Sequence, residues 1–218
     1  MQPEVPKDDT LAAALARHGI ELPEDRVELL GRYCRLLWNW NEKLNLTRHT
    51  DYERFVTRDV IDTLALSEEI AAGESVLDVG TGGGVPGVVL AILRPDVPVA
   101  LCDSVAKKAR AVRSIVESLA LPIPVFHTAA QEHLLKSRYD TLVVRAVARL
   151  RKVLTWFEPR WDRFDRLLLI KGPKWVEERG EARHLGLMTQ LELRRLKSYP
   201  MQGTDSESVV LQLRRESA

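Results

Sequence analysis

The sequence has few of the residues that build disulfide or metal sites. It contains two cysteines, Cys34 and Cys102, and five histidines that are scattered without ligand spacing: His18, His49, His127, His133 and His184. Neither a disulfide framework nor a zinc site is supported by this usage. We therefore expect buried thiols, surface imidazoles and no metal.

Long apolar runs are also missing, since none approaches the roughly 18–20 residues that span a bilayer. The first residues lack the basic start and apolar stretch of a secretory signal. Hydrophobic residues make up 45% of the chain and charged residues 29%, which is ordinary globular composition. These absences predict a cytoplasmic protein without a membrane partner.

The net charge of +1 hides an uneven distribution. Residues 1–104 carry 10 Lys and Arg against 18 Asp and Glu, whereas residues 105–218 carry 22 against 13, so the two parts have net charges of −8 and +9. This asymmetry suits an electropositive face for a polyanion, and it is equally compatible with solvated helix surfaces.

The first 70 residues are predicted to form a helical extension. Thr10 can cap a short helix that runs to about His18, and Pro23 can begin a second helix with acidic residues in its first turn. Residues 71–218 are expected to form the main domain, with one core and with these helices as its appendage, because from Ser75 the pattern changes to short apolar strands that alternate with helices.

The domain at 71–218 is predicted to be α/β. Strands are expected near 75–79, 97–102, 123–127, 140–145 and 165–170, and helices near 86–93, 105–119, 129–136, 149–157 and 173–188. Two later β-like runs, from 191 and at 208–213, are separated by Pro200 and Gly203 and should pair as an antiparallel hairpin at one sheet edge. The layout predicts a Rossmann-like class I methyltransferase fold with a mostly parallel, seven-stranded sheet.

Four glycines within five positions follow the first predicted strand: Gly80, Gly82, Gly83 and Gly84. An apolar strand, a glycine turn and a helix in this order form a nucleotide-binding βαβ unit. Glycines permit positive φ and let backbone N–H groups approach a ligand closely. The segment 78–84 is thus the candidate cofactor site.

The sequence of this loop is compatible with two cofactors, NAD and S-adenosylmethionine. Residues 82–87 match the G-x-G-x-x-G fingerprint of NAD-binding proteins, and Asp103 lies about 20 residues on, where a ribose-binding acid is expected. Asp78 at the strand end would repel a pyrophosphate but attract the ammonium and sulfonium of S-adenosylmethionine. The carboxylate favours S-adenosylmethionine, with Asp103 either accepting hydrogen bonds from the ribose hydroxyls or, together with Ser104, capping the next helix.

Five segments taken in order resemble one family: 40–47, with its tryptophan-asparagine start, 78–87, with Pro86 in the loop, 103–104, 145–148 and 171–172. The sequence is similar, over about residues 33–172, to the family of ribosomal RNA small subunit methyltransferase G, also called glucose-inhibited division protein B. The resemblance implies S-adenosylmethionine-dependent methylation of N7 of a guanine in 16S ribosomal RNA, with that RNA or the small ribosomal subunit as partner.

The same resemblance implies roles for individual residues. Gly80 and Val85 match cofactor-contacting positions, and Ala130 and Gln131 match the pair that contacts adenine. Arg145 matches the arginine that lines the site, and the RNA side is matched by Lys107 and Lys171. With Asp78, Gly82 and Asp103 from the loop argument, these positions complete the expected cofactor and RNA contacts.

Departures from the family pattern fall on the RNA side. Asp59 stands in place of a usual histidine, Ala129 and Gln131 in place of an arginine and a glutamate, Val144 in place of a serine, and Glu207 near a usual arginine. Fewer basic groups should weaken RNA phosphate contacts. A methyltransferase with a diverged substrate and a non-catalytic nucleotide- or NAD-binding module are therefore kept as alternatives.

Guanine N7 carries a lone pair at neutral pH, so methylation there needs no general base. Positioning should supply most of the acceleration, and Arg145 is the candidate catalytic residue that positions the base. Trp38 and Trp40 can either stack on a base or pack between helices, and their helical pattern favours packing. The enzyme is expected to act as a monomer.

Overall fold

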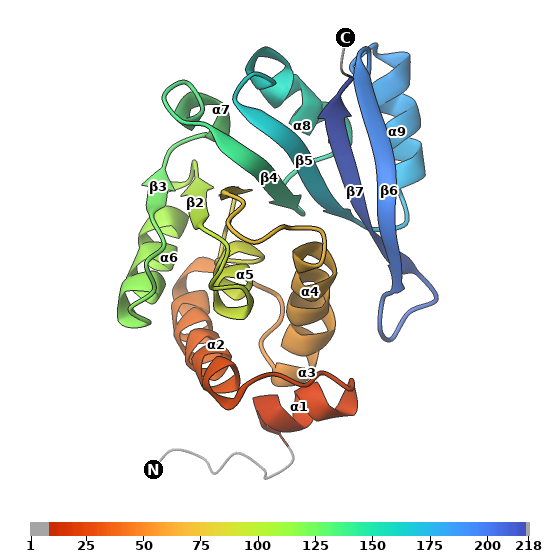
Figure 1. Cartoon of the computed structure of the whole chain (residues 1–218). Coiled ribbons are helices and arrows are strands. Elements are labelled where there is room, and N and C mark those ends of the chain that lie inside the picture. Colours follow the sequence, from red (N-terminus) through yellow and green to blue (C-terminus); the bar gives the residue numbers. More distant parts are fainter. Residues whose placement is uncertain (1–8, 217–218) are drawn as a thin grey trace.

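In the computed structural model, which describes residues 9–216, one seven-stranded sheet runs through the molecule in the order β3-β2-β1-β4-β5-β7-β6 (Figure 1). The strands are β1 (Val76–Val79), β2 (Val99–Asp103), β3 (Val125–His127), β4 (Tyr139–Arg145), β5 (Phe164–Lys171), β6 (Leu191–Pro200) and β7 (Glu207–Arg215). The first five strands are parallel, and β7 pairs antiparallel with both β5 and β6. The predicted fold class and the terminal hairpin are confirmed.

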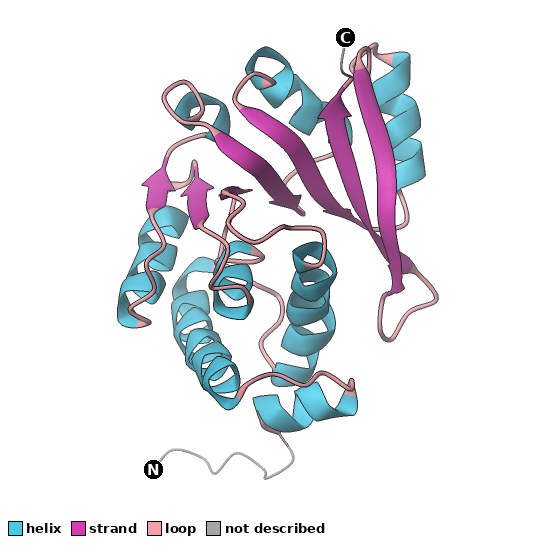
Figure 2. Cartoon of the chain, viewed as in Figure 1, coloured by secondary structure: helices cyan, strands magenta, loops and turns pink. Residues whose placement is uncertain are grey.

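Helices cover both faces of this sheet, as Figure 2 shows. They comprise α5 (Gly87–Leu93), α6 (Ala106–Ser118), α7 (Ala130–His133), α8 (Leu150–Phe157), the 3-10 turn η2 (Glu158–Arg160) and α9 (Trp175–His184). The central strands β1 and β2 are buried along their whole length because both of their faces meet helices. α9 ends ahead of Gly186, whose φ of +70° belongs to a helix-terminating turn, so it is shorter than the predicted 173–188.

The N-terminal extension is helical, as predicted. It contains α1 (Leu11–Arg17), α2 (Glu24–Leu44), α3 (Tyr52–Arg54), the π-helix η1 (Phe55–Val60) and α4 (Ile61–Ser67). The Thr10 hydroxyl accepts a hydrogen bond from the N–H of Ala13 at 3.1 Å and caps α1. Pro23 precedes α2, which has Glu24 and Asp25 in its first turn.

The extension shares its core with one face of the sheet. Leu30, Leu37 and Phe55 belong to the same buried cluster as Val88 of α5 and Val112 of α6. A second buried cluster, on the other sheet face, is formed with α8 and α9. The division at residue 70 stays a prediction, but α2 and α4 pack directly against α5.

Within residues 9–216, no helix combines the length and the apolar character needed to cross a bilayer. The same residues contain no cluster of three or more His, Cys, Asp or Glu side chains that could hold a metal ion. Cys34 and Cys102 are both buried thiols, as expected.

Candidate functional site

The glycine loop joins β1 to α5 at the carboxyl end of the parallel strands. Gly80, Gly82 and Gly84 have φ values of +67°, +59° and +108°, so the loop uses the backbone freedom that glycine provides. A Cβ on Gly80 would lie 2.9 Å from the side chain of Val147, which follows β4. The positive φ values agree with the predicted glycine turn, and the missing Cβ of Gly80 lets the loop pack against Val147.

Asp78 lies beneath this loop and is 1% exposed. Its Oδ2 accepts a hydrogen bond from the N–H of Gly87 at 2.9 Å, while its Oδ1 and the hydroxyl of Thr81 are buried without a partner among the described residues. Burial raises the pKa of Asp78 to about 6, against the opposing effects of Thr81 and Gly87. An unpartnered buried carboxylate oxygen fits a cofactor that carries positive charge, and it does not fit a pyrophosphate.

Asp103 ends β2 and fixes the loop from the other side. Its Oδ2 accepts from the N–H of Gly82 at 3.0 Å, and its Oδ1 accepts from the N–H of Val105 at 2.8 Å. The prediction that Asp103 or Ser104 caps the next helix is wrong, because Val105 is the N-cap of α6 and makes no side-chain cap bond. Asp103 instead joins the glycine loop to the start of that helix.

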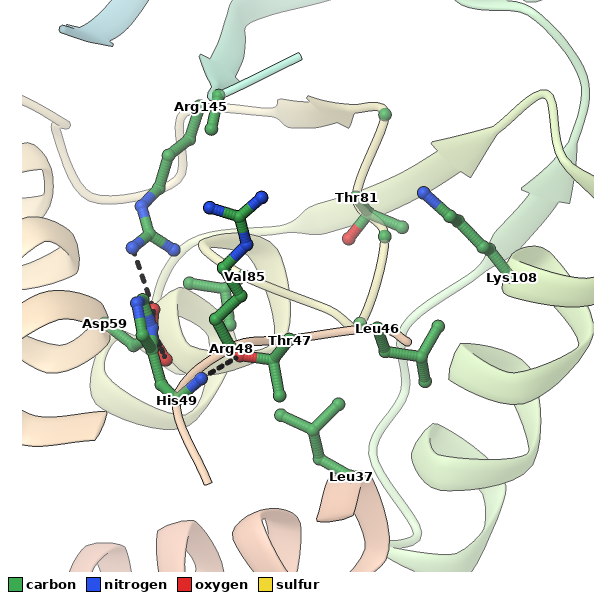
Figure 3. Close-up of a pocket in the computed structure, with 14 residues that line it drawn as sticks. Leu37, Leu46, Thr47, Arg48, His49, Asp59, Thr81, Val85, Lys108 and Arg145 are labelled. Atoms are coloured by element: carbon green, nitrogen blue, oxygen red, sulfur yellow. Dashed lines mark hydrogen bonds and ion pairs between the residues drawn. The ribbon is translucent and has the colours of Figure 1, made fainter. Parts of the chain in front are cut away.

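A first cavity of about 460 Å³ opens between the glycine loop and the N-terminal extension. It brings together four predicted residues: Gly80, Gly82, Val85 and Arg145. The extension supplies the opposite wall through Leu37 and residues 46–49, and Lys108 of α6 completes it (Figure 3). The extension is thus one wall of the first cavity.

The extension also supports the loop directly. Tyr33 of α2 is fully buried, and its hydroxyl donates to the carbonyl of Gly83 at 2.9 Å. A Cβ on Gly83 would meet Leu37 at 2.7 Å. Trp38 donates its Nε1–H to the carbonyl of His49 at 2.8 Å and packs on Tyr52, which agrees with the packing role expected for it.

Arg145 lies at the end of β4 and is bound on several sides. Its Nη2 is 2.8 Å from Asp59 and 3.0 Å from the carbonyl of Arg58, and its Nε donates to Asp62 at 2.8 Å. Burial works against the charge, but the two carboxylates outweigh it and raise the pKa of Arg145. Much of the guanidinium is therefore committed to the protein, although the side chain still lines the cavity.

His49 is the main site residue that the sequence analysis missed. The expectation of a surface imidazole is wrong here, because Nδ1 lies 2.9 Å and 3.0 Å from the two carboxylate oxygens of Asp59. Asp59 thus binds Arg145 and His49 together, which explains the aspartate at a position where the family usually has histidine. The nearest sequence signal was that departure, 10 residues from His49.

A second cavity, also of about 460 Å³, lies on the hairpin side of Arg145. It shares His49, Arg145 and Ala146 with the first cavity and reaches Lys171, where β5 ends. The Nζ of Lys171 donates to the carbonyl of Ala148 and to Glu178, both at 2.8 Å, so this lysine orders the loop after β4.

Five predicted residues line neither cavity: Asp78 and Asp103, which hold the loop from behind, and Ala130, Gln131 and Lys107. Ala130 is buried at the start of α7 and Gln131 follows it, half-buried, beyond the end of β3. Lys107 is exposed on α6, one position before the cavity residue Lys108. The glycine loop, Asp103 and Arg145 therefore lie together, whereas Ala130, Gln131 and Lys107 lie outside the lining of both cavities.

Comparisons with known proteins agree with this geometry. The family model described as rRNA small subunit methyltransferase G matches residues 26–207. A protein of Rhodopirellula baltica named ribosomal RNA small subunit methyltransferase G is 50% identical over 89% of this chain and 84% of its own length. Its namesake in Chromobacterium violaceum is 41% identical over 64% of this chain and 68% of its own.

Solved structures match the fold. M. capricolum TrmK, described in complex with S-adenosyl-homocysteine, has a TM-score of 0.56 at 11% identity and covers 70% of this chain and 67% of its own. A 16S rRNA N2 G1207 methyltransferase of T. thermophilus, described with AdoMet and guanosine, has a TM-score of 0.53 at 18% identity, over 73% of this chain and 43% of its own.

Proposed function

Because this chain belongs to the ribosomal RNA small subunit methyltransferase G family, it is an S-adenosylmethionine-dependent methyltransferase of 16S ribosomal RNA, and we propose that it methylates N7 of a guanine. The observation that supports the cofactor is the loop above Asp78, where a buried carboxylate oxygen without a partner among the described residues lies beside a glycine turn. The NAD alternative is not retained, since both the family and the carboxylate oppose it.

Several residues are proposed to hold the cofactor. Gly80, Gly82 and Val85 would contact it along the loop, with Asp78 below and Asp103 at the ribose. Ala130 and Gln131 would border its adenine, and Arg145 would close the site toward the acceptor. When bound, S-adenosylmethionine supplies an electrophilic methyl group on a sulfonium.

The protein's own contribution is positioning. Guanine N7 is unprotonated at neutral pH, so no residue has to remove a proton before the displacement. The Arg145 cluster and the loop after β4 fix the walls between the two cavities, and such preorganisation lowers the entropic part of the barrier. Lys107 and Lys171 are proposed to face the RNA, and the enzyme is proposed to act in the cytoplasm as a monomer.

The test is methyl transfer from labelled S-adenosylmethionine to small ribosomal subunits that lack the modification. We expect the label in 16S ribosomal RNA as 7-methylguanosine, identified by mass spectrometry of the nucleosides. Asp78→Asn is the control, and it should bind S-adenosylhomocysteine weakly. Label in a different nucleoside would refute the N7 assignment, and no label at any salt concentration would refute the substrate.

A further inference from the structure

The two cavities meet at three residues, His49, Arg145 and Ala146. The first cavity borders the glycine loop, and the second extends from there toward the hairpin. Each has a volume in the range of small-molecule sites. An acceptor base held in the second cavity and directed at the glycine loop would therefore lie beside these three residues.

His49 is taken as the group that contacts the base. Arg145 already uses its Nε and Nη2 on Asp59, Asp62 and the carbonyl of Arg58, and the side chain of Ala146 has no polar atom. The Nδ1 of His49 is held by both oxygens of Asp59, while its Nε2 has no hydrogen-bond partner within residues 9–216. The imidazole is 25% exposed, whereas the Asp59 side chain is 2% exposed, so the histidine presents the accessible part of the pair.

We infer that His49 binds the acceptor base through Nε2 and that the second cavity receives the nucleotide. This inference rests on the proposed function, because the base is taken to be the guanine that is methylated. Because Nδ1–H points at the Asp59 carboxylate, Nε2 carries the ring's lone pair and accepts, and guanine offers a donor in its exocyclic N2 amino group. Contact there would leave N7 free to face the cofactor, and Asp59 keeps the imidazole in one orientation without help from the substrate.

Three substitutions separate this role from a structural one. His49→Gln keeps a polar side-chain group near the position of Nε2, and His49→Asn keeps one near Nδ1, where it can still bind Asp59. His49→Ala removes both. His184→Gln is the matched control, because His184 is exposed at the end of α9 and lines neither cavity.

Each variant is assayed for kcat/KM with small ribosomal subunits, for S-adenosylhomocysteine affinity by calorimetry, and for Tm. His49→Ala should lower kcat/KM by about ten- to a hundredfold, the value of one substrate hydrogen bond. His49→Gln should recover part of that loss and His49→Asn should not, while S-adenosylhomocysteine affinity stays near that of the wild type.

Recovery by His49→Asn alone would overturn the inference, because it would place the whole role in the bond to Asp59. Unchanged kcat/KM in all three variants would overturn it too, as would a loss of S-adenosylhomocysteine affinity that matches the loss of activity. If the wild-type protein transfers no methyl group to 16S ribosomal RNA, the proposed function fails first and the inference fails with it.

Discussion

Each end of the parallel sheet holds a half-buried arginine that is paired with acidic side chains, Glu74 for Arg166 and Asp59 with Asp62 for Arg145, and the two clusters differ in completeness. At the amino end, Arg166 donates through all its nitrogens: Nε to Glu74 and Thr141, Nη1 to Gln212, and Nη2 to Glu74 and the carbonyl of Glu69. At the carboxyl end, Arg145 holds Asp59 and Asp62, but within residues 9–216 His49 Nε2 and the buried Asp78 Oδ1 and Thr81 hydroxyl have no hydrogen-bond partner.

This difference separates stability from function within one sheet. Unpaired buried polar groups cost free energy, so they are kept where a ligand can complete them. The complete cluster around Arg166 should act in folding alone. The incomplete cluster around Arg145 should matter for both folding and activity.

The largest effect is expected from Arg145→Met, which leaves Asp59 and Asp62 buried without their cation. Removing one partner of a buried ion pair costs about 3–5 kcal/mol of folding free energy. Methyl transfer should fall as well, because His49 loses the fixed position of Asp59. Urea denaturation and turnover of the remaining folded protein measure the two losses. Normal turnover per folded molecule in this variant would show that Arg145 has a structural role only.

Arg166→Met should destabilise the protein by a similar amount, about 3–5 kcal/mol, since Arg166 and Glu74 are 11% and 13% exposed. Its turnover per folded molecule and its S-adenosylhomocysteine affinity should match the wild type. The same denaturation and calorimetry experiments check this. If Arg166→Met lowered turnover per folded molecule, the two ends of the sheet would not differ in their role in activity.

The Asp78 carboxyl group, at the carboxyl end of the parallel strands, should make the free energy of unfolding depend on pH. Folding raises its pKa to about 6 from 3.8, so the protonated form is favoured in the folded state. The associated stabilisation is present below pH 3.8 and is lost as the pH rises through 6, up to about 3 kcal/mol. Asp78→Asn should lack this decline, which is measured as the difference between the two stability profiles from pH 4 to 8. If the two stability profiles ran parallel, burial would not raise the pKa of Asp78.

The smallest effect is expected from Arg138→Ala at the amino end. Arg138 pairs with Asp165, and the two side chains are 53% and 55% exposed. Exposed pairs contribute less than about 1 kcal/mol. Urea denaturation should therefore barely separate this variant from the wild type, and a loss as large as that of Arg166→Met would show that burial is not what distinguishes the inner cluster.

Local patterns were enough to predict most of the fold. The apolar run at β1, the glycines after it and the β-like runs near the C-terminus are each formed by residues that are neighbours in the sequence. The sheet and its hairpin could therefore be predicted from the sequence. The glycine loop could be predicted as the cofactor site for the same reason, because Asp78 and Gly80 lie only two positions apart in the sequence. Helix ends were less accurate, since turns such as that at Gly186 set them.

The acceptor side depends on contacts between distant residues. Arg145 binds Asp62 across 83 positions, and Tyr199 donates to the other oxygen of Asp62 across 137 positions. His49 lies outside the segments that resemble the family, so the sequence marked it only indirectly, through the departure at Asp59. Its role depends on Asp59, which η1 turns inward and buries.

The hydrogen bond from Tyr33 to the Gly83 carbonyl also bears on how this protein can be dissected. Residues 71–218 expressed alone would expose the floor of the glycine loop and lose one wall of the first cavity. Ligand binding and docking of the N-terminal helices should therefore be thermodynamically linked, each tightening the other. A shortened chain that begins at the sheet would be missing half of its binding site, although it would keep every glycine of the motif.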